Sequence, residues 1–150
     1  MITLIKKVNT NAIMPKFEYE GDTGFSLYTC EDITIKPRER LPKSTGVCFE
    51  FEEGYAFQIK CRSGITLYGV PTTDGKQSKI TIYEGTIDNN YRGAVSVIVE
   101  NNERHSITIP RGTKIAQGVI IKTYQCQFVE VSNLTDTDRG GNGFGSTGAN

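Results

Sequence analysis

The chain has 150 residues, enough for one domain with a sizeable hydrophobic core. Basic and acidic residues both number 17, and the resulting zero net charge argues against sequence-independent nucleic-acid binding, which needs a positive field. The short apolar start and the four cysteines without a CxxC pair predict a cytoplasmic protein with reduced thiols, no zinc site and no membrane or nucleic-acid partner.

Short runs of β-forming residues recur along the chain between turns rich in Gly and Pro. We predict strands at residues 2–8, 25–29, 32–35, 46–51, 55–61, 79–83, 94–99, 105–109, 114–121 and 125–131. A single helical turn is expected within residues 62–68, and the polar residues 71–79 are expected to form a loop. This pattern predicts an all-β domain, either a sandwich or a barrel, over residues 1–134.

Residues 85–93 lie between two of these predicted strands. Their middle, Asp88-Asn89-Asn90, consists of residues that tolerate tight turns and left-handed backbone. We therefore predict a β-hairpin with Asp88 at its tip and Tyr91 three residues further on. Taken alone, such a hairpin is more often an ordinary surface turn with a solvated acid.

Residues 135–150 differ from the rest because they are rich in Gly and contain one aromatic residue, Phe144. Such a segment cannot build a core by itself, and a disordered tail is the plain interpretation. Gly-rich backbone beside Ser, Thr and Arg also suits phosphate binding, since exposed N–H groups can surround an anion. An isolated Phe144 is a candidate ring to lie over a planar ligand.

Five segments, in order, resemble the five motifs of the homotrimeric dUTPase family. They are residues 21–28, 62–64, 85–93, 114–117 and 139–148. The resemblance implies a distorted jelly-roll β-barrel that assembles as a trimer with three active sites at subunit interfaces. It implies hydrolysis of dUTP to dUMP and pyrophosphate with Mg²⁺, and a C-terminal arm, 135–150, that closes over a neighbouring subunit's site.

The resemblance assigns the nucleoside part of the substrate to the central segment. Asp88, the only carboxylate in residues 85–93, would be the general base that activates water. Tyr91 would pack beneath the deoxyribose and leave no space for a 2′-hydroxyl group. The uracil edge would be read by main chain near Gly85, Ile87 and Ser96, where N–H and C=O groups distinguish a 4-oxo from a 4-amino base.

The triphosphate is assigned to the other motifs. Arg62, Ser63, Gly64 and Gln117 would hold the phosphates, and Arg139 would bind the γ-phosphate bidentately. The remaining tail residues expected to contact the substrate are Phe144, Gly145, Ser146 and Thr147. For Arg62, Tyr91 and Gln117 taken singly, an ion pair, a cross-strand aromatic and an edge-strand polar residue are the plain interpretations.

One residue departs from the family pattern. Ser26 stands where members usually have an Asp that orients water on the Mg²⁺ held by the triphosphate, and Ser cannot supply the charge. We therefore expect no direct protein ligand to the metal, Ser26 as an outer-shell group at most, and a gain in activity or in Mg²⁺ affinity from Ser26→Asp. The alternative hypothesis is a dUTP-binding regulatory protein with weakened hydrolysis. The related dCTP deaminases need a further acid at the base, which no matching motif provides.

Overall fold

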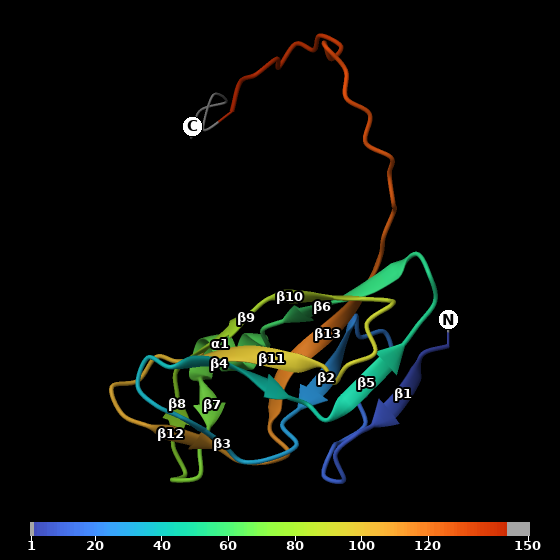
Figure 1. Cartoon of the computed structure of the whole chain (residues 1–150). Helices are drawn as coiled ribbons and strands as arrows, with labels where there is room; N and C mark the ends of the chain where they lie inside the picture. The colour runs from blue at the N-terminus through green and yellow to red at the C-terminus, as the bar shows by residue number, and fades with distance from the viewer. Residues whose placement is uncertain (1, 144–150) are drawn as a thin grey trace.

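The computed structural model describes residues 2–143, and it is built almost entirely from β-strands (Figure 1). The strands are β1 (Leu4–Lys7), β2 (Gly24–Tyr28), β3 (Ile33–Ile35), β4 (Arg40–Ser44), β5 (Val47–Glu50), β6 (Tyr55–Lys60), β7 (Val70–Pro71), β8 (Gln77–Ser78), β9 (Ile80–Tyr83), β10 (Gly85–Asp88), β11 (Ser96–Asn101), β12 (Ile107–Ile109) and β13 (Lys114–Lys122). One short helix, α1 (Ser63–Tyr68), follows β6. No helix in this part of the chain is long and apolar enough to cross a membrane.

Antiparallel pairing organises the strands into one larger sheet and several smaller ones. The larger sheet has the order β10-β6-β13-β2, and a second sheet has the order β4-β11-β9. The pairs β1-β5, β12-β3 and β7-β8 complete the body. In β9 and β12 buried residues alternate with half-buried ones, and the buried sides of the strands meet in one core. The all-β fold class predicted from the sequence is confirmed.

Aromatic rings fill the centre of this core. Phe57 of β6 is 1% exposed, and its ring centroid lies 4.9 Å from that of Phe49 and 5.5 Å from that of Phe25. Phe25 in turn requires Gly118 on the neighbouring strand, because a Cβ there would come within 2.3 Å of the Phe25 ring. These contacts fix β2, β6 and β13 to one another, and the candidate site lies at their edge.

We expect Phe57→Ala to destabilise the fold more than any exposed aromatic change. Truncating a fully buried Phe removes about 3–5 kcal/mol of stability through lost burial and the remaining cavity. Urea unfolding followed by circular dichroism measures this loss. The matched control is Phe128→Ala, since Phe128 is 92% exposed and should leave the midpoint nearly unchanged. An equal effect of both changes would contradict the assignment of the core.

Most predicted strands and the helical turn are found, and two local differences fall within residues 36–79. Residues 40–44 were not predicted as a strand, yet they form β4 despite Pro42. β4 lies at the edge of its sheet, where a missing N–H is tolerated. The predicted loop at residues 71–79 contains the small β7-β8 pair, whose turn is closed by Thr72 donating to Asp74 at 2.6 Å.

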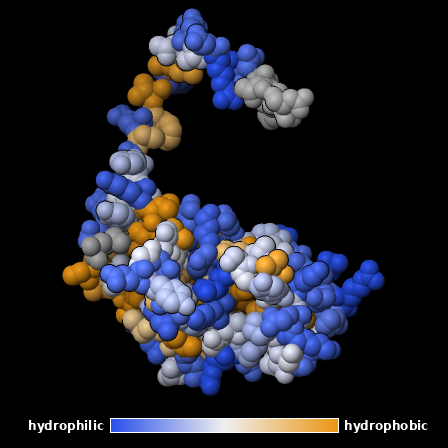
Figure 2. Space-filling model, turned by 180° about the vertical axis from the view of Figure 1, so that it is seen from behind, coloured by the Kyte–Doolittle hydropathy of each residue, from blue (hydrophilic) through white to orange (hydrophobic). Residues whose placement is uncertain are grey.

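The predicted strand at residues 125–131 is wrong. These residues pair with no strand in the described part of the chain, and they belong to an extended segment that runs away from the body (Figure 1). Their apolar residues face solvent, with Phe128 and Val129 92% and 71% exposed, and hydrophobic atoms stand out along this segment (Figure 2). Strand-like alternation needs a partner edge, and one copy of the chain supplies none.

The predicted hairpin around Asp88 is only partly correct. β9 and β11 do pair antiparallel, with Tyr83 opposite Ile98. However, residues 85–88 leave this pair and form β10, which joins the other sheet beside β6. Asp88 is therefore the last residue of β10 and not the tip of the hairpin. The turn follows it, closed by the Tyr91 N–H donating to the Asp88 carbonyl at 3.1 Å.

Candidate active site

A cavity of about 600 Å³ lies where β6 ends and α1 begins. Four residues predicted from the sequence to bind phosphate line it together: Arg62, Ser63, Gly64 and Gln117. They come from two distant segments, and antiparallel pairing brings them together because Gln117 on β13 lies opposite Lys60 at the end of β6. The structure thus groups the second and fourth motifs in one chain.

Local hydrogen bonds shape this cavity. Gln117 Nε2 donates to the Cys61 carbonyl at 3.1 Å, which ties β13 to the start of α1. The first N–H groups of α1 have no intrahelical acceptor, and no side chain at Arg62 caps them. A Cβ at Gly64 would meet nothing within 4 Å, which leaves its backbone accessible to a ligand. The cavity therefore offers a guanidinium, an amide and free main-chain donors, which is chemistry suited to an anion.

A hydrogen-bonded chain of polar groups holds the Arg62 side chain in position. Its Nη1 donates to Ser26 Oγ at 2.9 Å, and Ser26 Oγ donates to Glu18 Oε1 at 3.1 Å. The same Glu18 oxygen pairs with Lys114 Nζ at 2.8 Å and accepts from the Tyr28 hydroxyl at 3.3 Å. Ser26 is 1% exposed, so it is an internal link in this chain.

Glu18 is ionised throughout the neutral range. The hydrogen bond from Lys114 is the largest influence, and with Ser26 and the charge of Lys16 it outweighs desolvation and lowers the pKa of Glu18 to about 2. Sequence reasoning missed this residue because it precedes the first motif and belongs to none. Only the fold brings residues 16–18 beside β2, where the Ser26 N–H donates to the Lys16 carbonyl at 2.8 Å.

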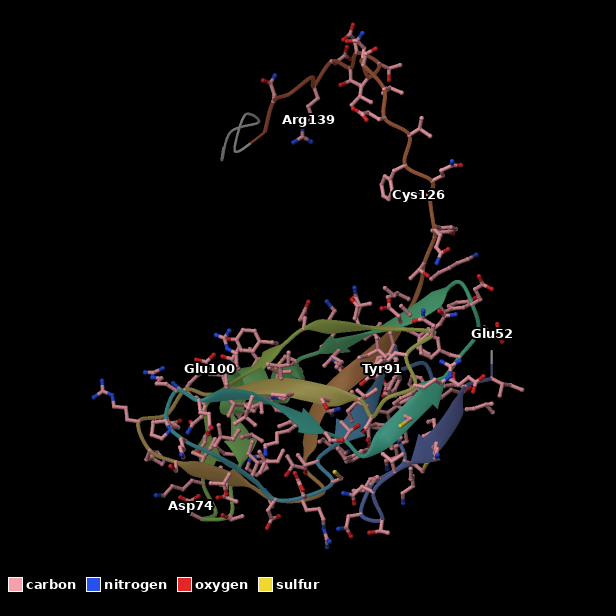
Figure 3. The ribbon with its side chains drawn as sticks, viewed as in Figure 1. Glu52, Asp74, Tyr91, Glu100, Cys126 and Arg139 are labelled. Atoms are coloured by element: carbon pink, nitrogen blue, oxygen red, sulfur yellow. The ribbon has the colours of Figure 1, made fainter. Side chains whose placement is uncertain are left out.

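Asp88 and Tyr91 occupy a different region of the protomer. Asp88 lies opposite Ala56, near the start of β6, whereas Arg62 follows the end of that strand. Six residues of extended chain place the two on the order of 20 Å apart. Among the described residues the exposed Asp88 carboxylate makes no hydrogen bond or ion pair, and Tyr91 lies on the loop after β10, away from α1 (Figures 1 and 3).

Tyr91 is kept in place by the glycine that follows two residues later. A Cβ at Gly93 would come within 2.3 Å of the Tyr91 hydroxyl oxygen, so the ring lies directly against the Gly93 backbone. The hydroxyl group also donates to the Ala94 carbonyl at 3.3 Å. The Tyr91 side chain remains 46% exposed, which leaves part of the ring available for contact. Arg92 pairs with Glu50 and donates to the Asn89 carbonyl, so it supports the turn.

The other predicted site residues are placed as follows. Gly85 and Ile87 lie on β10, with Ile87 packed against the core, and Ser96 begins β11 opposite Ser44. Arg139 lies on the extended C-terminal segment, far from the body, where its Nε donates to the Asn142 carbonyl at 3.0 Å (Figure 3). The predicted tail contacts of Phe144, Gly145, Ser146 and Thr147 fall outside the described residues. Among residues 2–143, one protomer therefore does not bring the predicted groups together.

The comparisons with known proteins agree with the motif pattern. The family model described as dUTPase matches residues 10–148. A protein of Helicobacter pylori (strain P12) named deoxyuridine 5'-triphosphate nucleotidohydrolase is 40% identical over 144 residues, covering 96% of this chain and 94% of its own. A protein of the same name from Nautilia profundicola is 40% identical over 145 residues and covers 96% of each chain.

Solved structures give the same match in three dimensions. The dUTPase of Staphylococcus bacteriophage 80alpha with dUPNHPP superposes with a TM-score of 0.86 at 25% identity, covering 99% of both chains. A mutant dUTPase from phage phi11 of S. aureus, described with a structural Mg(II) ion, has a TM-score of 0.78 at 21% identity over 89% of this chain and 98% of its own. The fold of this chain is that of these enzymes.

Proposed function

The chain belongs to the dUTPase family, and from this we propose that it hydrolyses dUTP to dUMP and pyrophosphate. The observation that supports the proposal best is the cavity, where Arg62, Gln117 and the start of α1 meet. The reaction removes dUTP and supplies dUMP for thymidylate synthesis, and we place it in the cytoplasm. In this proposal residues 1–134 form the catalytic domain, whose barrel ends with β13, and residues 135–150 form an arm.

The proposed reaction is an attack of water on the α-phosphorus. Asp88 takes one proton of that water as its oxygen bonds to phosphorus, and the bond to the bridging oxygen breaks, with its electron pair leaving on pyrophosphate. Arg62, Gln117 and the N–H groups of Ser63 and Gly64 bind the phosphate oxygens whose charge blocks the attack. Arg139, on the arm, adds a bidentate contact to the γ-phosphate.

The residues present fit a magnesium ion that is carried by the substrate. Residues 2–143 contain no group of three His, Cys, Asp or Glu side chains that would ligate a metal. The nearest carboxylate to Ser26 is Glu18, whose oxygens already face Lys114, Lys16 and two hydroxyl groups. When bound through the triphosphate oxygens, Mg²⁺ neutralises part of their negative charge.

A homotrimer accounts for the separation between Asp88 and Arg62. Both residues are needed at one α-phosphate, yet within one chain they lie on the order of 20 Å apart at opposite ends of β6. A closed cyclic assembly places the β10 end of one copy beside the α1 cavity of the next. The extended segment 124–143, which touches little of its own body, supports an arm that reaches a further copy (Figure 1).

Gly93→Ala should impair selection of the deoxyribose. The new methyl group would overlap the Tyr91 ring and displace it, and a shift of about 1 Å at a substrate contact costs up to about 100-fold in kcat/KM. Steady-state rates with dUTP and UTP measure this, and discrimination between them should fall. Tyr91→Phe is the control, since it keeps the ring and removes only the hydroxyl contact to Ala94. Unchanged discrimination between dUTP and UTP in Gly93→Ala would mean that Tyr91 does not contact the sugar.

The proposed function is tested by one assay with three nucleotides. The purified protein is incubated with Mg²⁺ and dUTP, dCTP or UTP, and pyrophosphate and ammonia are measured. We expect pyrophosphate from dUTP alone. Tight dUTP binding without turnover would favour a regulatory protein, and ammonia from dCTP would indicate a deaminase. The same assay after removal of Mg²⁺ by chelation should show a much lower rate.

A further inference from the structure

A single carboxylate, Glu18, connects two cations at the edge of the phosphate cavity. It pairs with Lys114 at 2.8 Å and reaches Arg62 through Ser26, with hydrogen bonds of 3.1 and 2.9 Å. Lys16 adds a third positive charge at 3.8 Å. All of these contacts join groups of the chain itself.

We infer that Glu18 is a positioning residue that supplies, from outside the motifs, the negative charge that Ser26 lacks. The inference rests on the proposed dUTP hydrolysis and deepens it. Ser26 lies opposite Gln117 in the β2-β13 pair, so the strand position next to this cavity residue carries a hydroxyl group in place of an acid. Glu18 brings a carboxylate within hydrogen-bond distance of that hydroxyl group. Ser26 Oγ donates to Glu18 and accepts from Arg62, and so it links the carboxylate to the guanidinium.

The geometry gives Glu18 two effects on phosphate binding. First, a guanidinium whose Nη1 is already directed to Ser26 loses less rotational freedom when a phosphate binds to its remaining donors. Second, the carboxylate offsets the mutual repulsion of Arg62, Lys114 and Lys16, which otherwise drives these side chains apart in the free protein. The Glu18 side chain is 24% exposed, so solvent screens these charges only in part.

The same contacts change what Ser26→Asp should do. From the sequence alone that change restores a missing acid and raises activity. In the structure it places a second carboxylate about 3 Å from Glu18, in a buried position, where two like charges repel. We therefore expect Ser26→Asp to lower activity while Glu18 is present and to raise it when Glu18 is neutral.

A double-mutant cycle tests the inference. Glu18→Gln keeps an acceptor for Ser26 and Tyr28 but removes the charge. By analogy with the residues that orient metal ligands, this change should reduce kcat/KM for dUTP by about 10–100-fold. Adding Ser26→Asp to it should recover activity to within about three-fold of the wild type, a non-additive result expected for groups in contact. Glu20→Gln, which removes an exposed charge two residues away, is the control and should have no effect.

Binding and unfolding measurements separate positioning from a structural role. The affinity for dUPNHPP, measured by calorimetry, should fall in Glu18→Gln and return in the double variant, while the thermal midpoints of both stay close to that of Glu20→Gln. Full activity in Glu18→Gln, no recovery in the double variant, or a gain from Ser26→Asp alone would each overturn the inference. Should Glu18→Gln fail to fold, the Ser26→Asp single variant decides between the outcomes: lower activity supports the inference and higher activity overturns it. A wild type without dUTP turnover refutes the proposed function instead, and analogue affinity then decides the role of Glu18.

Discussion

Asp88→Asn should abolish dUTP turnover and leave nucleotide binding intact. Asn has the same shape as Asp and accepts no proton near neutral pH, and losing a positioned general base costs about 10²–10⁴-fold in rate. Because Asp88 is exposed at the end of β10 and makes no hydrogen bond or ion pair among residues 2–143, the change should not disturb the fold. Single-turnover hydrolysis and dUPNHPP binding measure the two effects separately.

Glu53→Gln is the matched control for this change. Glu53 lies on the turn before β6 and borders the same hollow as Asn89 and Asn90, so its charge is close to Asp88. Removing that charge should leave the rate within about two-fold of the wild type, as expected for a surface carboxylate. A similar loss in both variants would mean that the local field, and not a proton acceptor, matters. A fully active Asp88→Asn variant would remove Asp88 from the chemistry.

The alternation of residues predicts the individual strands but not the sheets to which they belong. Residues 79–83 and 94–99 were expected to form one hairpin, and β9 and β11 do pair. The local pattern could not predict the departure of β10 to the other sheet, because that depends on its pairing with β6, in which Gly85 lies opposite Ile59, 26 residues earlier in the chain. This departure has a functional consequence. Asp88 lies beside the start of β6 and not at the tip of a hairpin, whereas Arg62 follows the end of β6.

The site shows the same division between local and long-range information. The motifs predict which residues gather in the cavity, since Arg62 and Gln117 are both found there. They give no sign of Glu18, which joins the site because the bridge between Lys16 and Ser26 brings residues 16–18 beside β2 and the start of β13. Such a charge is invisible in the sequence because 96 residues separate Glu18 from Lys114, and only the folded chain makes them neighbours.

Two inactive variants should restore activity to each other if the site is shared between copies. In a homotrimer in which each site takes Arg62 from one copy and Asp88 from another, Arg62→Ala and Asp88→Asn each remove one of the two groups from every site. When the two proteins are mixed equally, unfolded and refolded together, random assembly makes about a quarter of the interfaces with both halves intact. We therefore expect about a quarter of the wild-type rate from a mixture whose components are each nearly inactive.

The control for this experiment is a chain that carries both changes. Refolding Asp88→Asn with the Arg62→Ala/Asp88→Asn double variant supplies no intact Asp88, so no interface can recover, whatever the assembly. Activity in the first mixture and none in the second would place Asp88 and Arg62 of different copies in one site. No recovery in either mixture, with native mass spectrometry showing mixed trimers, would contradict a shared site. Asp88 and Arg62, on the order of 20 Å apart along β6, would then have to approach each other by a rearrangement within one protomer. Since β6 is the central support of both the aromatic core and the cavity, that rearrangement would break the packing of Phe57 against Phe25 and Phe49. The assembly of copies requires no such loss, and for this reason we expect the first mixture to recover.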